Sequence, residues 1–569
     1  VGSEMCIRDS PLGFSIQTTY SPRFEWTNYL FHKAAASPDS GSQNGRVERT
    51  HTKDFYWQWD NMLKWNKTFG KHAFDFTFLA NWEKFQRWHD EMTNENFLPT
   101  DELGYGGIGF GTSPNVSSDD VYRTGDAFMG RLHYVYDQRY LITATVRRDG
   151  YSAFGLANPR ATFPAIALGW VFSEEKFLHR PDWFEYGKLR LSWGKNGNRA
   201  VGTYAAFMQL APRKYIYVDP ATGSLVTANT FYASTMANPN LKWESTTSWN
   251  IGTDLTFLKG RLSANLDVYK KITTDLLVSR ELPSLIGYSS VMSNIGEVQN
   301  TGVELSLNST NIRMDKLTWR TSFSLAYNKN KITHLYGIME DVKDADGNVI
   351  GQREADDIKN KRFIGHDIDE IWDYKVVGIW QEEEREEAAK YGQQPGDVHL
   401  LDKDMNYKYD NTDKEFQGTT MPRLRWSMRN DFTLFKNFNI SFNMYSYIGH
   451  KKTLGRFTND NALLNVTNQI KRDYWTPENR NNEYPRLANK KPAGVSYAIY
   501  KNASFLRFDN ISIGYTFPKK LIEPLRIQNL NVNATMKNAG YISGWPGYDP
   551  ENSDANTPRV IYFGINLTL

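Results

Sequence analysis

Apolar and polar residues alternate with a period of two in stretch after stretch of this sequence. Between residues 262 and 269, leucine, alanine and valine alternate with serine, asparagine and aspartate. The final stretch is apolar at every second position, with Ile561, Phe563, Ile565, Leu567 and Leu569. Because successive side chains of a strand point to opposite faces, this pattern predicts strands with one apolar and one polar face.

The length and number of these stretches favour one kind of β protein. A soluble β-sandwich also alternates, but many stretches here run to about ten residues, the length with which a tilted strand crosses a bilayer. We count about 16 to 17 such strands, more than a usual sheet contains. Short turns alternate with long polar segments, near residues 89–118, 196–238, 333–422 and 451–500. The expected fold is an antiparallel transmembrane β-barrel with long extracellular loops.

Composition excludes the other class of membrane protein. A membrane-spanning helix needs about 20 consecutive apolar residues, and no such run occurs in a chain with 40% hydrophobic residues and a mean hydropathy of −0.59. Aromatic residues nevertheless make up 14% of the chain. Those near strand ends are expected to form a girdle at the membrane interface, although burial in a core is the alternative for each: Trp57, Trp59, Tyr140, Trp170, Trp193, Trp243, Tyr269 and Tyr515.

Charge and motifs exclude several function classes. The net charge is only +3 and no basic block stands out, so no nucleic-acid partner is expected. The single cysteine, Cys6, allows neither a disulfide framework nor a cysteine-based zinc site. Neither a nucleophile elbow, a phosphate-binding loop nor an HExxH motif occurs. We therefore expect no catalytic residues and no enzyme activity.

The order of several short motifs resembles that of a known family. The runs PNLKWE at 239–244 and NIGTD at 250–254 precede NIGEVQNTGVEL at 294–305. Earlier in the chain stand RYLITATVRRDG at 139–150 and LRLSWG at 189–194. Near the end stand IGYTFP at 513–518 and GYDPE at 547–551. In this order the motifs resemble the SusC/RagA family of TonB-dependent outer-membrane transporters, and the resemblance covers nearly all of the chain after residue 10.

The resemblance implies a larger protein than this chain. Such transporters have a barrel of about 22 strands, an N-terminal plug inside it and a short segment that recruits TonB. This chain has no room for those parts, so we expect residues 11–569 to be the C-terminal part of the barrel, without the plug and the first strands. Residues 1–10, VGSEMCIRDS, look like neither a leader nor a strand, and we interpret them as a non-native junction.

The resemblance also implies a function and partners. The intact protein would import oligosaccharides, or alternatively peptides, across the outer membrane of a Gram-negative bacterium. The TonB-ExbB-ExbD complex would supply energy through the missing N-terminal part, and a SusD-like surface lipoprotein would bind substrate together with the extracellular loops. From the residues alone, a passive porin, a structural outer-membrane protein and a soluble β-sandwich that binds or cleaves carbohydrate remain alternatives.

One acidic segment has the spacing of a calcium-binding loop. Positions 1, 3, 5, 9 and 12 of such a loop supply side-chain oxygens and position 7 a backbone carbonyl; here they are Asp402, Asp404, Asn406, Asp410, Asp413 and the Lys408 carbonyl. The usual glycine at position 6 is Tyr407, and position 12 is aspartate instead of glutamate. Ca²⁺ is thus one interpretation of residues 402–413, and a solvated acidic loop is the other. No further cofactor is expected.

Two other features of the long segments bear on function. The run EEEREEAAK at 382–390 predicts a short, solvated helix. Aromatic residues of these segments can either stack on a bound solute or pack within their loops, and the sequence does not choose between them: Tyr105, Phe110, Tyr204, Phe207, Tyr215, Tyr217, Trp380 and Tyr391.

Overall fold

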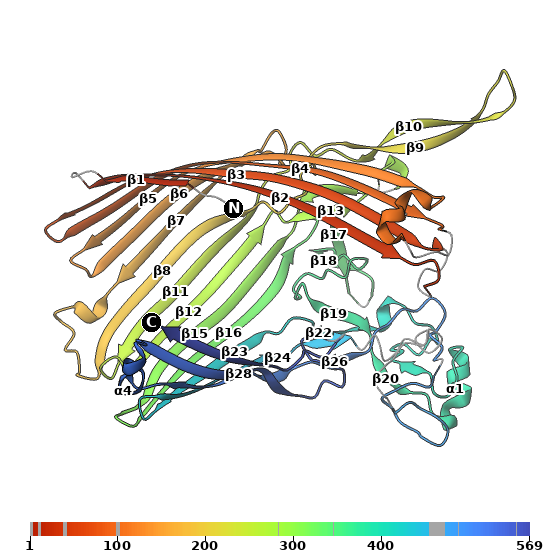
Figure 1. Ribbon diagram of the computed structural model, residues 1–569. Coiled ribbons are helices and arrows are strands. Elements are labelled where there is room, and N and C mark those ends of the chain that lie inside the picture. The colour runs from red at the N-terminus through yellow and green to blue at the C-terminus, as the bar shows by residue number, and fades with distance from the viewer. Residues whose placement is uncertain are drawn as a thin grey trace. The chain divides into compact units, whose positions relative to one another are not determined.

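The computed structural model is built almost entirely of antiparallel strands (Figure 1). It describes residues 4–9, 13–37, 43–97, 103–282, 284–288, 290–344, 346–453, 473–487, 489–552 and 555–569. One sheet holds 17 strands, which confirms the expected fold class and strand number, and the remaining strands form two-stranded ribbons. Within the described ranges, none of the helices has the length and apolar character that a membrane crossing requires. Two compact units divide the chain, Val1–Val171, Arg190–Trp249 and Lys271–Glu297 in the first, and Phe172–Leu189, Asn250–Lys270 and Val298–Leu569 in the second.

The first unit begins with a simple meander in which each strand pairs antiparallel with the next. Its strands are β1 (Glu4–Asp9), β2 (Phe14–Lys33), β3 (Arg46–Phe69), β4 (His72–Glu95), β5 (Asn115–Tyr136), β6 (Tyr140–Tyr151) and β7 (Arg160–Trp170). The chain continues through β8 (Phe184–Asn198), β11 (Glu244–Phe257) and β12 (Leu262–Thr274). Between them lie the hairpins β9 (Gln209–Val218)–β10 (Leu225–Thr235) and β13 (Leu277–Glu281)–β14 (Ser290–Asn294).

The two faces of this meander differ as the alternation predicts. One face, here called the apolar face, presents large hydrophobic side chains that are 39–54% exposed, among them Phe76, Phe78, Leu132, Ile142, Val146, Ile166 and Leu168. The opposite, polar face carries amides, carboxylates and guanidinium groups. A row of exposed aliphatic and aromatic side chains is unfavourable in water and favourable against lipid tails, as on the outside of a membrane barrel.

The structure corrects two expectations about this unit. Residues 4–9 form a strand, β1, that pairs with β2, so the expectation of no strand in this segment was wrong. An exposed strand edge offers backbone partners to an extended segment whatever its side chains are. Moreover, β4 continues to Glu95 and β5 begins at Asn115, so the segment expected between 89 and 118 is shorter. The sequence did not predict these strand ends because their residues are polar on both faces. Apolar and polar residues alternate only where one face of the strand meets lipid.

The second unit holds a second meander, in which β16 (Leu317–His334), β23 (Leu424–Leu434), β24 (Phe438–Ile448), β27 (Phe505–Thr516), β28 (Asn529–Ser543) and β29 (Val560–Thr568) pair in that order. Strand β15 (Glu297–Met314) precedes them. The connections at 314–317 and 434–438 are short, whereas those after β16 and β24 are long. Residues 137–138, 259–260 and 436–437 form tight turns between neighbouring strands, as the expected alternation of short turns and long segments requires.

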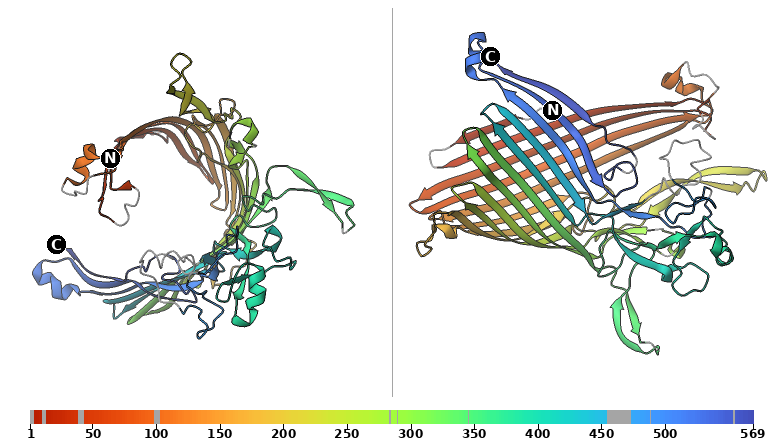
Figure 2. Two further views of the ribbon diagram at one scale, coloured as in Figure 1. Left: turned by 90° about the vertical axis from the view of Figure 1, so that its right-hand side faces the viewer. Right: turned by 90° about the horizontal axis from the view of Figure 1, so that it is seen from below.

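The long connections of the second unit form a lobe with its own core. It contains β19 (Glu370–Tyr374), β20 (Val376–Ile379), η5 (Glu382–Glu384), α1 (Arg385–Lys390), β21 (Val398–Leu400), η6 (Asn411–Asp413), β22 (Lys414–Thr419), β25 (Lys451–Thr453) and β26 (Tyr500–Asn502). Its buried cluster includes Ile379, Val398, Leu400 and Trp475. The predicted helix at 382–390 is confirmed as η5 and α1. The hairpin β17 (Met339–Lys343)–β18 (Val349–Glu354) extends as a separate ribbon (Figure 2).

Short helical turns complete the two units: η2 (Gly104–Phe110), η3 (Phe172–Glu174), η4 (Ser284–Ile286), α4 (Lys519–Ile522) and η7 (Glu523–Leu525). The last two connect β27 to β28.

Candidate functional site

The polar face of the first unit is organised in rows that run across neighbouring strands. Directly opposite residues share a face, and the register sets Asp60 beside Asn81 and Gln58 beside Glu83. Asn81 Nδ2 donates to Asp60 Oδ1 at 2.6 Å, and Gln58 Nε2 donates to Asp60 Oδ2 at 2.8 Å. The Tyr56 hydroxyl donates to Gln58 Oε1 at 2.7 Å. These bonds fix the orientation of several side chains in advance of any ligand.

Two neighbouring pockets on this face share side chains. The larger has a volume of about 780 Å³, and its walls include Gln58, Asp60, Asn81, Glu83, Arg147 and Lys195. A smaller pocket of about 300 Å³ is bounded by Tyr56, Phe85, Arg123 and Tyr151 and shares Glu83 and Arg199 with the larger one. Pockets of this size, lined by oriented hydrogen-bonding groups and a few aromatic rings, suit the binding of a small polar solute.

The two pockets meet at an ion pair between Glu83 and Arg199. Gly125 lies between Glu83 on β4 and Tyr151 on β6, and a Cβ at this glycine would come within 2.6 Å of the Glu83 carboxylate. The missing side chain therefore leaves the space in which Glu83 meets Arg199. The Arg199 guanidinium lies over the Tyr151 ring at 4.8 Å, from the segment that follows β8.

Trp243 lies in a buried cluster and not in the interfacial girdle that its position near a strand end suggests. It is 5% exposed and packs with Tyr151, Phe154 and Phe163 in a buried cluster of the first unit. Of the two interpretations that the sequence left open for Trp243, the interfacial girdle and burial in a core, the structure shows burial in a core, because other parts of its own unit cover this side chain. Trp59 and Tyr140, at 44% and 42% exposure, do present their rings as a girdle requires.

The acidic loop at 402–413 brings together three of its predicted ligands. Carboxylate oxygens of Asp402, Asp404 and Asp413 lie within 4.8 Å of one another. Asp413 is fully buried and accepts from the backbone N–H groups of Lys403 and Asp410, each at 2.9 Å. Its position is thus fixed from two sides of the loop, as the last ligand of a cation loop requires.

The other predicted ligands of this loop stay outside that cluster. Asp410 caps η6 by accepting from Thr412 N at 2.7 Å. Asn406 accepts from the backbone N–H of Lys408 at 2.7 Å and donates to Asp404. Tyr407 has a φ of 64°, the left-handed conformation that usually calls for glycine. The backbone therefore turns at position 6 as a calcium loop does, although the residue there is tyrosine.

The charges of the loop are closely coupled. Burial raises the pKa of Asp402, but hydrogen bonds from the Tyr407 backbone and the Tyr391 hydroxyl outweigh it and hold the pKa below its usual range. Loss of hydration and the adjacent Asp402 carboxylate raise the pKa of Asp404. Two carboxylates this close repel each other unless a proton or a cation lies between them.

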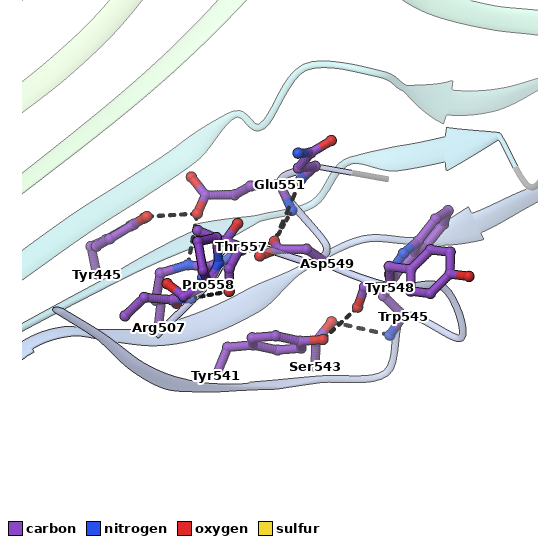
Figure 3. A network of polar contacts seen from close by, with 12 residues as sticks. Tyr445, Arg507, Tyr541, Ser543, Trp545, Tyr548, Asp549, Glu551, Thr557 and Pro558 are labelled. Atoms are coloured by element: carbon purple, nitrogen blue, oxygen red, sulfur yellow. Dashed lines mark hydrogen bonds and ion pairs between the residues drawn. The ribbon is translucent and has the colours of Figure 1, made fainter. Parts of the chain in front are cut away.

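A second polar cluster ties the loop after β28 to the sheet of the second unit (Figure 3). Arg507 of β27 donates to Asp549 at 2.5 Å and reaches Glu551 at 2.7 Å. The Tyr445 hydroxyl of β24 donates to the same Glu551 carboxylate at 2.6 Å. In the sequence, the GYDPE motif served only as a mark of resemblance, and its contact with Arg507 was missed, because the spacing carries no sign that the two segments meet.

A family model described as TonB dependent receptor-like, beta-barrel matches residues 8–539. The chain belongs to this family. Its members are outer-membrane receptors for transport, so the predicted location is confirmed. The TonB-dependent receptor SusC of Bacteroides thetaiotaomicron is 32% identical over 467 residues, which are 78% of this chain and 43% of SusC. The TonB-dependent receptor P3 of Formosa agariphila is 28% identical over 555 residues, 96% of this chain and 53% of P3.

Solved structures agree on the fold of this TonB-dependent receptor barrel. The structure of the RagAB peptide transporter superposes with a TM-score of 0.77 at 19% identity, covering 99% of this chain and 61% of that one. The family model and the 32% identity to SusC confirm the SusC/RagA resemblance. The chain spans about half the length of the curated relatives it matches.

The loop aromatics of the receptor divide into two groups. Trp380 is 2% exposed and stacks on His399 with 3.5 Å between ring centroids, so it is part of the loop core. Tyr391 stacks on Tyr409 at 5.1 Å beside the acidic loop. Tyr215 and Tyr217, at 60% and 41% exposure, lie on β9 with their rings stacked on each other. Tyr215 and Tyr217 therefore offer free ring surface, as do four other loop aromatics that are 39–68% exposed: Tyr105, Phe110, Tyr204 and Phe207.

Proposed function

We propose that this receptor takes part in TonB-dependent import of oligosaccharides across the outer membrane, together with a SusD-like surface lipoprotein. The observation that carries the proposal is the contrast between the two faces of the first unit. One face is apolar and exposed, and the other holds two pockets with pre-oriented polar side chains. A wall of this kind separates lipid from a polar path for solute.

The chemistry of the larger pocket supports a glycan over a peptide as the cargo. Amide and carboxylate groups of Gln58, Asp60, Asn81 and Glu83 offer many acceptors and donors at short spacing. Such amide and carboxylate groups can form hydrogen bonds with neighbouring hydroxyl groups of a sugar ring. The identity to SusC, at 32%, also exceeds the 19% identity to the RagAB peptide transporter. Peptide import by the same route is the second candidate.

Uptake by cells tests the proposal directly. A strain with the complete gene and a deletion strain are compared for uptake of fluorescent oligosaccharides and of fluorescent peptides, with and without a protonophore. We expect oligosaccharide uptake that requires both the gene and the proton gradient. Uptake that persists with the protonophore would instead indicate a passive porin, and gene-dependent uptake of peptides alone would replace the glycan by a peptide.

Purification of the receptor tests the proposed lipoprotein partner. Affinity purification of the complete receptor from outer membranes is expected to yield a surface lipoprotein in about equal amounts. A receptor that purifies alone under mild detergent, while transport in cells persists, contradicts the requirement for such a lipoprotein.

We further propose that the loop at 402–413 binds Ca²⁺ through Asp402, Asp404 and Asp413, with Asn406, Asp410 and the Lys408 carbonyl completing the shell upon binding. Calorimetric titration of the purified receptor with Ca²⁺ tests this. Asp404→Asn is expected to weaken binding at least about tenfold through the loss of one charged ligand. The matched control, Asp344→Asn, alters an acidic β-turn on another loop and should leave binding unchanged. Absence of binding at millimolar Ca²⁺ would contradict the proposal and favour the alternative interpretation, a solvated acidic loop without a bound cation.

A further inference from the structure

Charged groups on the rows next to the smaller pocket are almost all paired. On the polar face, four arginines and three carboxylates come from three neighbouring rows across β2 to β5 and from the segment after β8. Each carboxylate has its own arginine, in the pairs Arg23–Glu25, Arg87–Asp54 and Arg199–Glu83. The fourth cation, Arg123 on β5, has no carboxylate partner among the residues that the structure describes.

The surroundings of Arg123 hold it in place without neutralising it. The register sets Tyr56, Phe85 and Arg123 side by side on three adjacent strands. The guanidinium carbon of Arg123 lies 4.2 Å from the centroid of the Phe85 ring. Stacking uses the flat face of a guanidinium, whereas its N–H donors point outward in the plane. The donors of Arg123 therefore stay available to a ligand in the 300 Å³ pocket.

The nearest carboxylates on this face are already engaged or distant. Asp54 receives two hydrogen bonds from Arg87, at 2.8 and 2.7 Å, and Arg123 acts on this carboxylate only as a more distant charge. Asp119 lies on the same face of β5, but four residues of strand separate it from Arg123, about 13 Å at about 3.3 Å per residue. A local excess of one positive charge thus remains at the pocket wall.

The position of Arg123 along its strand makes it accessible from outside the cell. From Arg123 to the end of β5 at Tyr136, next to a short turn, the strand is about 43 Å long. The hydrocarbon core of a bilayer is only about 30 Å thick, and short turns of such barrels lie on the periplasmic side. Even with a tilt of about 40°, Arg123 stands beyond the hydrocarbon layer on the side of the long loops.

We propose that Arg123 is an anion subsite for the cargo, which makes the transported glycan an acidic one that bears carboxylate or sulfate groups. The inference rests on the proposed import of oligosaccharides and specifies their class. The planar, bidentate donor set of a guanidinium matches the oxygens of either group. Phe85 keeps the guanidinium in place, and Glu83 and Tyr56 flank it in the same pocket with groups that hydroxyls of the sugar can reach.

An array of acidic glycans, each printed beside its neutral counterpart, tests the inference. Methyl-esterified oligogalacturonate is the counterpart of the carboxylated probe, and desulfated carrageenan oligosaccharide that of the sulfated one. The complete receptor, purified with its native partner, is expected to retain charged members at least about tenfold better, the size of one charged hydrogen-bonded contact. The preferred pair identifies carboxylate or sulfate as the group bound.

Two variants locate the effect. Arg123→Gln should abolish the preference for the charged member, while Arg148→Gln should preserve it, because Arg148 lies opposite Phe128 on the apolar face of the neighbouring strand. Equal mobility of both variants on heat-modifiability gels verifies that they fold. Retention of neutral and charged glycans alike, or a preference that Arg123→Gln leaves intact, overturns the inference but not the proposed function. Retention of no glycan at all, with binding of peptides, overturns both.

Discussion

The Arg507 guanidinium donates to Asp549 Oδ1 at 2.5 Å, and the two side chains retain only 3% and 1% of their exposure. The contact joins β27 to the loop that follows β28, so this buried pair, together with the contacts of Glu551, holds a loop that the strand ladder itself does not hold. Isolated buried charges are costly, and each group here depends on the other.

Replacing Arg507 by Met is expected to destabilise the barrel by about 3–5 kcal/mol, since Asp549 would remain buried without its cation. Urea unfolding of the purified receptor, followed by tryptophan fluorescence, measures the change. Arg429→Met is the matched control, because the Arg429–Asp431 pair on β23 is 58% and 40% exposed and such pairs contribute about 0–1 kcal/mol. Equal losses for both variants would contradict the assignment of Arg507 as the anchor of the loop.

The Arg507–Asp549 ion pair is expected to break at acidic pH. Burial raises the pKa of Asp549, but hydrogen bonds from Thr557, the Glu551 backbone and Arg507 outweigh it and hold the pKa below the usual value, which is about 3.9. A carboxyl with a lowered folded-state pKa adds stability above its ordinary pKa and loses it as pH falls through the lowered one. Proteolysis of residues 544–559 should thus accelerate below about pH 4. In Asp549→Asn the loop should be cleaved readily at every pH.

A second pH dependence should arise from His450. This side chain is 3% exposed, and burial, reinforced by the charges of Lys452 and Arg425, lowers its pKa to about 4. An unfolded histidine binds its proton near pH 6.5, so the unfolded state gains protons first as pH falls. The free energy of unfolding should therefore decrease between about pH 6.5 and about pH 4.

His450→Gln is expected to remove this part of the pH dependence, measured by urea unfolding at pH 7 and pH 5. The exposed His179 provides the comparison, since His179→Gln should leave the curve of the wild type unchanged. If the curve keeps its slope in His450→Gln, another group is responsible for it.

The turn between β5 and β6 offers a stabilising change. Asp137 and Gln138 have φ of 50° and 57°, and Arg139 N donates to Tyr136 O at 3.0 Å, which defines a hairpin turn with two left-handed residues. Glycine adopts this conformation without the strain that glutamine bears. Gln138→Gly should raise the free energy of unfolding by about 0.5–1 kcal/mol. Gln58→Gly, in the extended backbone of β3, should lower it instead.

Much of the fold follows from local pattern. Strand β12 and the last strand, β29, stand where the alternation predicts them, because the side-chain period of a strand is a local property of the backbone. Residues 4–9 were missed as a strand because their pairing depends on the edge of β2 rather than on their own pattern. The ends of β4 and β5 were missed for a related reason, since no lipid selects apolar residues there.

Site prediction was less complete. Of the six ligands that the loop spacing predicts, the structure brings the carboxylates of Asp402, Asp404 and Asp413 together, because the loop folds back and places Asp413 beside the first two. The spacing gives no sign that the Asp410 side chain caps η6, as it does in the structure. The pocket at Arg123 and the anchor at Arg507 had no sequence signal, since an arginine on a strand looks the same whether its partner is solvent or a carboxylate.

The sequence by itself determined that this protein is a sheet with one face for lipid and one for water, because neighbouring side chains of a strand cannot share a face. Only the tertiary structure decided which polar residues meet on the second face. Glu83 and Arg199 are 116 residues apart in the chain, yet they form an ion pair. Their contact depends on the register of three strands and on the gap left by Gly125. Register is a relation between strands, and no single stretch of sequence contains it.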